Sequence, residues 1–376
     1  MINREGLQPW KKRLFFDVKP GQEGIFYLKL HVGDEGRFFD KNMYFDLFVY
    51  DQKLNTDPII VHVDRPNKEK ETTANITSTI DTSAPTNNRT LQPEAITDRI
   101  RVKLGFESDT IQISPSKTAL LSPQKGRTEE IAKTHTFTIK NGHIFDGEND
   151  LGTFVRLQGH DVDTIWSIEN WDHSPGWNPN LNDNMYRDTL ELKIEDGKII
   201  IINELPLHHY LNGIAEVSNT DPTEKLRTMM ILSRSYALFY MTQAEKFPGK
   251  PYHLDDSPER CQNYKGYGLE LRAPNMVTSN ADTAGMVVTY DGDLIKTPYF
   301  NQSDGWTRSA EEVWGWTHTP YLQRVDDSIC GKTQRLGHGV GLSGCGATNM
   351  AIQGDGFEKI IQYYYQGVEI DNASDL

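Results

Sequence analysis

The sequence predicts an α+β fold: a mostly β domain that carries one long amphipathic helix and a C-terminal helix, preceded by a small β-sandwich-like module. Alternating apolar residues occur near the N-terminus and again from Ile100 onward. A polar, Ser/Thr-rich stretch separates the two regions, and a helical period appears at 222–245. We therefore divide the chain into an N-terminal module (1–65), a linker (66–97) and a larger domain (98–370).

The N-terminal module is predicted from three runs in which apolar and polar residues alternate, 26–32, 45–49 and 59–63. Turn-forming residues at 20–21 and 34–36 separate these runs from their neighbours. Short strands with tight turns are typical of a small β-sandwich, and three runs are enough for either an incomplete or a minimal one.

The larger domain begins with further strands, among them the run LELKIEDGKIIIINE, whose Asp-Gly pair predicts a hairpin turn. A helix is predicted at 222–245, with Asp221 as its N-cap, Pro222 in its first turn and Glu224 completing a capping box. A second helix is predicted at 347–364, after a glycine-rich stretch.

Charge and composition narrow the classes of function. The chain has 376 residues and a formal net charge of −14, which argues against binding nucleic acid through a diffuse basic surface. No apolar run is long enough to span a membrane, and the N-terminus lacks the apolar core of a secretory signal. Either the chain is cytoplasmic or the sequence begins inside a longer exported protein. We expect the second, with a site of action outside the cell or in the cell envelope.

Glu216 is the first candidate for chemistry, because it is a lone carboxylate on the loop before the helix at 222–245. A carboxyl group in that position can donate a proton. The alternative is an exposed loop carboxylate that the helix macrodipole stabilises. Arg227 and Arg234, seven residues apart, share a helix face that could meet an anion, or that is simply solvated.

Two later loops also hold candidate residues. In YFNQSDGWT (299–307), Tyr299, Ser303 and Thr307 are spaced to line a groove. In GHGVGLSGCGA (337–347), His338 stands among glycines that imply unusual backbone conformations or very close contacts. A lone histidine is often structural. A nucleophilic Cys345 acting with His338 is a rival enzyme hypothesis.

Several segments in order resemble the sporulation stage II protein D family, also called the SpoIID/LytB domain. They cover roughly residues 98–370 and read LPLHHYLNGIAE, DPTEKLRTMMILSRSYAL, CQNYKG, YFNQSDGWT, EVWGW, PYL, HGVGLSGCGATNMA and YYYQGVEI. The resemblance implies a cell-envelope protein that acts on the glycan strands of peptidoglycan. Active members of the family are lytic transglycosylases that prefer strands without stem peptides, and relatives are described as enhancers of a wall amidase.

The resemblance assigns the catalytic glutamate to Glu216, which stands six residues before Pro222 as in the family. The family usually has Glu-Met-Pro where this chain has Glu-Val-Ser, and the loop from Tyr210 is slightly shorter. In YFNQSDGWT, Asn301 and Asp304 replace a serine and a glycine of the family pattern. The substrate-binding residues that we expect are Arg234, Tyr236, Tyr299, Ser303, Thr307, His338 and Ser343.

A lytic transglycosylase of this kind can work with one carboxyl group, whereas ordinary glycosidases use two. Glu216 would protonate the glycosidic oxygen and then accept the proton of the C6 hydroxyl that attacks C1. Its pKa would have to be raised by an apolar pocket. The alternative function is a wall protein that binds glycan, or assists an amidase, without turnover.

Three cysteines allow at most one disulfide within the chain. The resemblance pairs Cys261 with Cys330, and the alternative is a zinc site that adds a histidine. Metal-binding CxxC spacing is missing, so we predict no metal and no cofactor. The predicted partners are peptidoglycan glycan strands and, in the alternative reading, a wall amidase, with no nucleic acid. The oligomeric state stays open.

Overall fold

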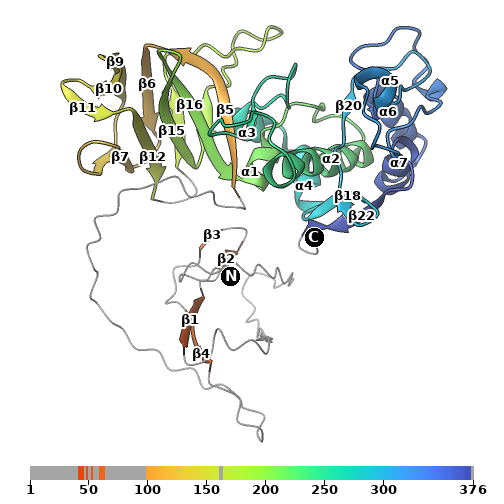
Figure 1. Cartoon of the computed structure of the whole chain (residues 1–376), viewed down its shortest axis with the longest axis horizontal. Coiled ribbons are helices and arrows are strands. Elements are labelled where there is room, and N and C mark those ends of the chain that lie inside the picture. Colours follow the sequence, from red (N-terminus) through yellow and green to blue (C-terminus); the bar gives the residue numbers. More distant parts are fainter. Residues whose placement is uncertain are drawn as a thin grey trace, which may run out of the picture. The chain divides into compact units, whose positions relative to one another are not determined.

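The computed structural model describes residues 99–160 and 164–373, together with the backbone of four short strands nearer the N-terminus (Figure 1). The chain divides into two compact units, Met1–Arg89 and Thr90–Leu376. In the first unit, β1 (Lys41–Phe45) pairs antiparallel with β4 (Ile59–Val63), and β2 (Phe48–Val49) pairs with β3 (Gln52–Lys53). The predicted linker at 66–97 lies outside the described residues, and the predicted sandwich and domain boundaries stay predictions.

The second unit is mixed α+β, with more residues in strands than in helices. Its larger sheet has the strand order β17-β5-β16-β15-β12-β7-β8. These strands are β5 (Arg99–Ser108), β7 (Ala119–Pro123), β8 (Glu129–Ile131), β12 (Phe154–Gly159), β15 (Thr189–Glu195), β16 (Lys198–Pro206) and β17 (Leu254–Asp255). The predicted hairpin is confirmed, because β15 and β16 pair antiparallel around Asp196 and Gly197, both at positive φ.

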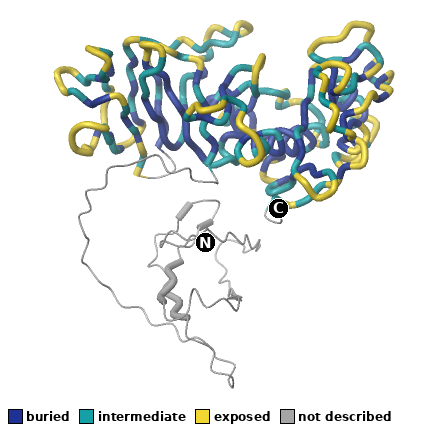
Figure 2. Tube along the Cα trace, in the orientation of Figure 1, coloured by how far each residue is buried: buried dark blue, intermediate teal, exposed yellow. Residues whose placement is uncertain are grey.

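A second sheet has the order β11-β10-β9-β6-β13-β14. Its strands are β6 (Thr110–Pro115), β9 (His135–Lys140), β10 (His143–Asp146), β11 (Asn149–Gly152), β13 (Ile165–Ile168) and β14 (Met185–Arg187). Alternating residues of both sheets are buried together, such as Val102 and Leu157 from one and Phe137 and Trp166 from the other. We call this cluster the sheet core, and Figure 2 shows the buried strand segments that form it.

Helices and short strands make up the rest of the unit (Figure 1). The helices are α1 (Leu207–Asn212), α2 (Thr223–Thr242), α3 (Gly266–Arg272), α4 (Pro274–Asp282), α5 (Ala310–Trp314), α6 (Gly344–Ile352) and α7 (Phe357–Tyr364), with a 3₁₀ turn η1 (Ser328–Cys330). The strands are β18 (Met286–Tyr290), β19 (Asp293–Leu294), β20 (Tyr299–Phe300), β21 (Leu342–Ser343) and β22 (Glu369–Asn372). Within the described residues, no helix is both long enough and apolar enough to cross a membrane.

The long helix α2 is buried on two sides, whereas the amphipathic helix that we predicted would bury one. Leu226 and Met230 belong to the sheet core. Ile231 and Leu232 belong to a second cluster with residues of α6, α7 and β18, which we call the helical core. Helix α2 therefore joins the two halves of the unit, as its central position in Figure 1 shows.

The predicted caps and the predicted C-terminal helix need correction. Helix α2 begins at Thr223 with Pro222 as its cap residue and no side-chain cap. Asp221 instead forms an ion pair with Lys225 at 2.9 Å. Glu224 accepts a 3.0 Å hydrogen bond from the backbone N–H of Phe357, so it satisfies the first turn of α7. The helix predicted at 347–364 is two helices, α6 and α7, because the chain turns at Gly354 with φ of 95°.

Candidate active site

A cavity of about 980 Å³ lies among the loop before α2, one side of α2, the loop before α3 and the segments around β20, α5 and β21. Its polar and charged lining residues are Glu216, Ser218, Asp221, Lys225, Lys246, Glu259, Arg260, Gln262, Lys296, Asn301 and His338. Aromatic rings also line it, from Tyr236, Tyr240, Tyr299, Phe300, Trp314 and Trp316. Of the predicted site residues, the structure brings Glu216, Tyr236, Tyr299 and His338 together at this cavity.

The position of Glu216 is fixed by backbone pairing with a distant segment. The N–H of Ala215 donates to the carbonyl of Asn263 at 2.7 Å, and the N–H of Lys265 donates to the carbonyl of Gly213 at 2.7 Å. The N–H of Asn263 then donates to Oε1 of Glu216 at 2.6 Å. A glycine is needed at 213, because a Cβ there would lie 2.6 Å from the buried ring of Tyr264.

Burial raises the pKa of the Glu216 carboxyl group, and the hydrogen bond from Asn263 opposes part of that rise. Two other carboxyl groups line the cavity, and their settings differ. Asp221 is paired with Lys225 and accepts a bond from the N–H of Ser218 at 3.0 Å. The hydroxyl of Ser257 holds the pKa of Glu259 below its usual value. Glu216 is thus the lining carboxyl group suited to carry a proton near neutral pH.

Tyr299 presents a phenol group near this carboxyl, and Tyr236 presents one at the same cavity. The Tyr299 hydroxyl accepts a 3.0 Å bond from Nε2 of Gln262 and lies 3.4 Å from Oγ of Ser233. Its pKa is raised well above the usual value, first by burial and then by the charge of Glu216. Burial also raises the pKa of Tyr236. Both phenols therefore stay protonated and can serve as hydrogen-bond donors.

His338 lines the cavity as a neutral ring. Its Nδ1 accepts a 3.0 Å bond from the N–H of Val340, and burial lowers its pKa. The rings of Trp314 and Phe300 lie 4.8 and 5.7 Å away, centre to centre. The rival pairing of His338 with a nucleophilic Cys345 is wrong, because Cys345 is in a disulfide and has no free thiol.

Four predicted substrate-binding residues do not line the cavity, because their polar groups are buried in structural contacts. Arg234 binds Oδ1 of Asn280 at 2.7 Å and the carbonyl of Met286 at 3.0 Å, so it ties α2 to α4 and β18. Ser303 donates to Oδ2 of Asp327 at 2.5 Å. Thr307 accepts a 2.8 Å bond from the N–H of Val325, and Ser343 caps the N-terminus of α6. Arg227, predicted to face solvent or an anion, pairs with Glu224 and Asp282.

The glycine-rich loop has the backbone conformations that its composition predicts. Gly337, Gly339 and Gly341 all have positive φ, between 75° and 105°. A Cβ at Gly341 would lie 1.9 Å from the carbonyl oxygen of Pro298. This close contact lets β21 pair parallel with β20 and so places His338 beside Tyr299.

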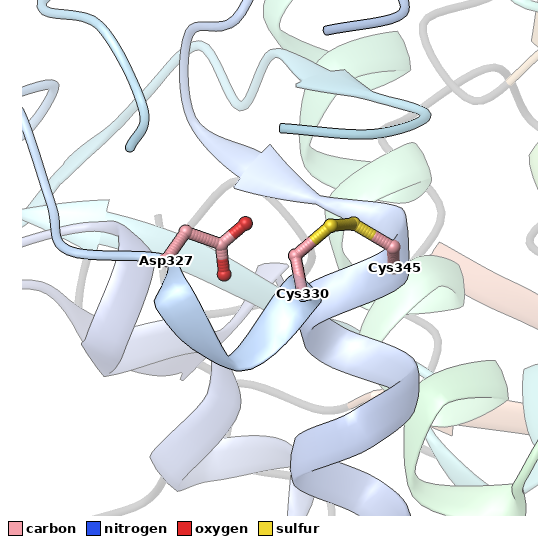
Figure 3. A group of neighbouring side chains, drawn as sticks. All are labelled: Asp327, Cys330 and Cys345. Carbon is pink, nitrogen blue, oxygen red and sulfur yellow. A yellow bond between two sulfur atoms is a disulfide. The ribbon is translucent and has the colours of Figure 1, made fainter. Parts of the chain in front are cut away.

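The disulfide joins Cys330 to Cys345, and the predicted pairing of Cys261 with Cys330 is wrong (Figure 3). Cys330 is the last residue of η1 and lies 5.1 Å, Cα to Cα, from Cys345 at the start of α6. Cys261 is free and lies on the cavity wall, where burial raises the pKa of its thiol to about 12. It is therefore a weak nucleophile at neutral pH.

Asp327 lies beside the disulfide, and within the described residues these three form the group with metal-ligand spacing (Figure 3). The group does not suit zinc as it stands. Both sulfur atoms are bonded to each other, and zinc binds the thiolate form. The two carboxylate oxygens of Asp327 already accept bonds from Ser303 and from Tyr364 at 2.5 and 2.6 Å. The group contains no histidine of the kind that the zinc alternative required.

Sequence reasoning did not identify Lys246, Lys296 and Gln262 as site residues, nor the two tryptophans of EVWGW, Trp314 and Trp316. No local sequence pattern distinguishes the two lysines and the glutamine from other residues of the same types, so nothing marked them as part of a site. The paired tryptophans did offer a signal, because aromatic residues in a polar loop often mark a binding surface.

Residues 195–290 match a family model described as SpoIID, Stage II sporulation protein. Proteins named "Stage II sporulation protein D" from Bacillus subtilis (strain 168) and Bacillus amyloliquefaciens are each 21% identical to this chain over 262 residues, covering 46% of this chain and 76% of the relative. A protein of Brachyspira hyodysenteriae is 28% identical over 154 residues, which is 40% of each chain. The matched segment includes Glu216 and Asn263, whereas Tyr299 and His338 follow it.

Proposed function

We propose, on the premise that this chain carries a SpoIID-family domain, that it cleaves peptidoglycan glycan strands by a lytic transglycosylase mechanism with Glu216 as the single acid and base. Similarity to stage II sporulation proteins supports a cell-wall role connected with sporulation. One observation carries the mechanism. The carboxyl group of Glu216 is held at a large cavity in surroundings that raise its pKa.

The reaction has two proton transfers through one group. Protonated Glu216 donates to the oxygen of the glycosidic bond while the bond from C1 to that oxygen breaks. The resulting carboxylate then accepts the proton of the C6 hydroxyl of the same sugar while its oxygen forms a bond to C1. The product is a 1,6-anhydro sugar, no water is consumed, and Glu216 returns to its protonated state.

Other cavity residues suit this chemistry. The protonated phenol of Tyr299 can donate to negative charge that develops on a leaving oxygen. The half-buried tryptophans Trp314 and Trp316 line the same cavity, where indole rings can contact sugar rings. The proposed place of action is the cell envelope, because peptidoglycan is found there.

The test incubates the purified chain with glycan strands stripped of stem peptides and measures 1,6-anhydromuramic products by mass spectrometry. We expect product from the wild type and a loss of about 10²–10⁴-fold in Glu216→Gln. Glu259→Gln, at another cavity carboxyl, is the matched control and should keep most of the activity.

Two outcomes would decide against parts of the proposal. If the wild type binds strands but forms no anhydro product, the chain is a non-catalytic glycan-binding or amidase-enhancing protein. Equal product from Glu216→Gln and the wild type would reject Glu216 as the acid while leaving the activity in place.

A further inference from the structure

Two lysine ammonium groups share one aromatic ring on the wall of the cavity. The Nζ atoms of Lys246 and Lys296 lie 5.1 and 5.3 Å from the ring centre of Tyr240. Lys296 also lies 4.0 Å from the ring centre of Trp316 and 5.1 Å from that of Phe239. Contacts with aromatic faces hold both cations at defined positions in the site.

Neither ammonium group forms an ion pair with a carboxylate of the described residues. The other two cations of the cavity do, since Lys225 pairs with Asp221 at 2.9 Å and Arg260 with Asp255 at 2.5 Å. The contrast is marked in a chain with a net charge of −14, where acidic partners are abundant. Partial burial and the charge of Lys246 lower the pKa of Lys296, so a bound anion would relieve an existing repulsion.

We propose that Lys246 and Lys296 form a subsite for a carboxylate carried by the sugar strand, in the same cavity as Glu216. This inference rests on the proposed function for the identity of the strand. The hydroxyl and acetamido groups of an N-acetylated glycan are neutral, so they can accept hydrogen bonds from the two ammonium groups but cannot balance their charge. The lactyl substituent of muramic acid supplies a carboxylate, which is ionised at neutral pH.

That carboxylate is free only when no peptide is attached, because a stem peptide joins the lactyl group through an amide and removes the charge. The subsite therefore selects strands by charge, and not merely by the space that a peptide would occupy.

The test measures binding by calorimetry with the Glu216→Gln chain, so that turnover cannot disturb the measurement. The two ligands are a muramic-acid-containing oligosaccharide with free carboxylates and the same oligosaccharide with each carboxylate converted to a methylamide. We expect the free acid to bind at least about tenfold more tightly at low salt, with the difference shrinking as salt is added. Lys246→Met with Lys296→Met should make the two ligands bind equally.

Two further variants separate charge from packing. Lys296→Arg keeps the charge and should keep the preference. Lys359→Met removes a lysine that is paired with Asp355 away from the cavity, and should leave the preference unchanged. Circular dichroism and thermal unfolding show whether each variant is folded.

Equal binding of acid and methylamide by the parent chain would overturn the inference. A preference that survives in the double lysine variant would overturn the assignment to these residues. Because this readout is binding, a preference for the acid together with a wild type that forms no anhydro product would reject the proposed catalysis and keep the subsite.

Discussion

The backbone N–H of Asn263 donates a 2.6 Å hydrogen bond to Oε1 of Glu216. No other hydrogen bond of Glu216 is found within the described residues, so Oε2 is available to a substrate. The acid is thus held by main chain from the loop before α3. Burial raises the pKa of Glu216, and the hydrogen bond from Asn263 lowers it in part.

The pH dependence of cleavage should report this balance. Glu216 must be protonated for the first step, and its pKa is raised, so kcat/KM falls as pH rises through that elevated pKa. The measurement is a profile of anhydro-product formation from about pH 4 to 9. A rate that rises steadily over that range would contradict the role of Glu216 as an acid.

Asp256 should make folding stability depend on pH. Burial raises its pKa from 3.8 to about 6, although it accepts a 2.8 Å bond from the N–H of Gly105. The folded state therefore binds the proton more tightly, and the free energy of unfolding falls as pH rises from about 4 to about 6, by about 3 kcal/mol. Urea unfolding across this range measures the effect. In Asp256→Asn the free energy of unfolding should change less with pH. If its pH dependence is the same as in the wild type, other groups cause the effect.

The disulfide between Cys330 and Cys345 should contribute measurably to stability. It closes a loop with a sequence separation of 15, for which chain entropy predicts about 3 kcal/mol. The double variant Cys330→Ser with Cys345→Ser should lose about 3 kcal/mol of unfolding free energy and so unfold at a lower urea concentration. Cys261→Ser is the control and should change stability little, and thiol titration of the unfolded, unreduced protein should find one free cysteine. A peptide map that links Cys261 to either partner would contradict the pairing.

Gly341→Ala should destabilise the protein by at least about 3 kcal/mol, because the new Cβ meets the carbonyl of Pro298 in addition to the strain of a positive φ. Gly249→Ala separates the two effects. Gly249 has a similar φ of 73° with nothing within 4 Å of the added carbon, so it should lose only about 1 kcal/mol. Equal losses in urea unfolding would mean that the loop relaxes around the clash.

Local patterns predicted some parts of this structure well. The Asp-Gly pair at 196–197 specifies its hairpin by backbone preference alone. The apolar period of α2 located the helix, since such a period belongs to the helix itself. The glycines around His338 implied a close contact, which is the one with Pro298.

Other features depend on which segments meet in space, and the sequence alone does not encode that locally. Glu224 has the spacing of a capping box but caps α7, because α7 packs against the start of α2. Cys330 pairs with Cys345 since the two lie at adjoining helix ends. Ser303 matched a family position, yet burial turns its hydroxyl toward Asp327 and away from the cavity.

The contact of Lys296 with Trp316 gives the protein an internal optical signal. An ammonium group 4.0 Å from an indole centre changes the emission energy of that ring, and an anion that neutralises the ammonium changes it again. Ligand arrival should thus shift tryptophan fluorescence without any added dye. Trp316→Phe would remove this component and leave the emission of the other tryptophans, so occupancy of the cavity could be followed in real time.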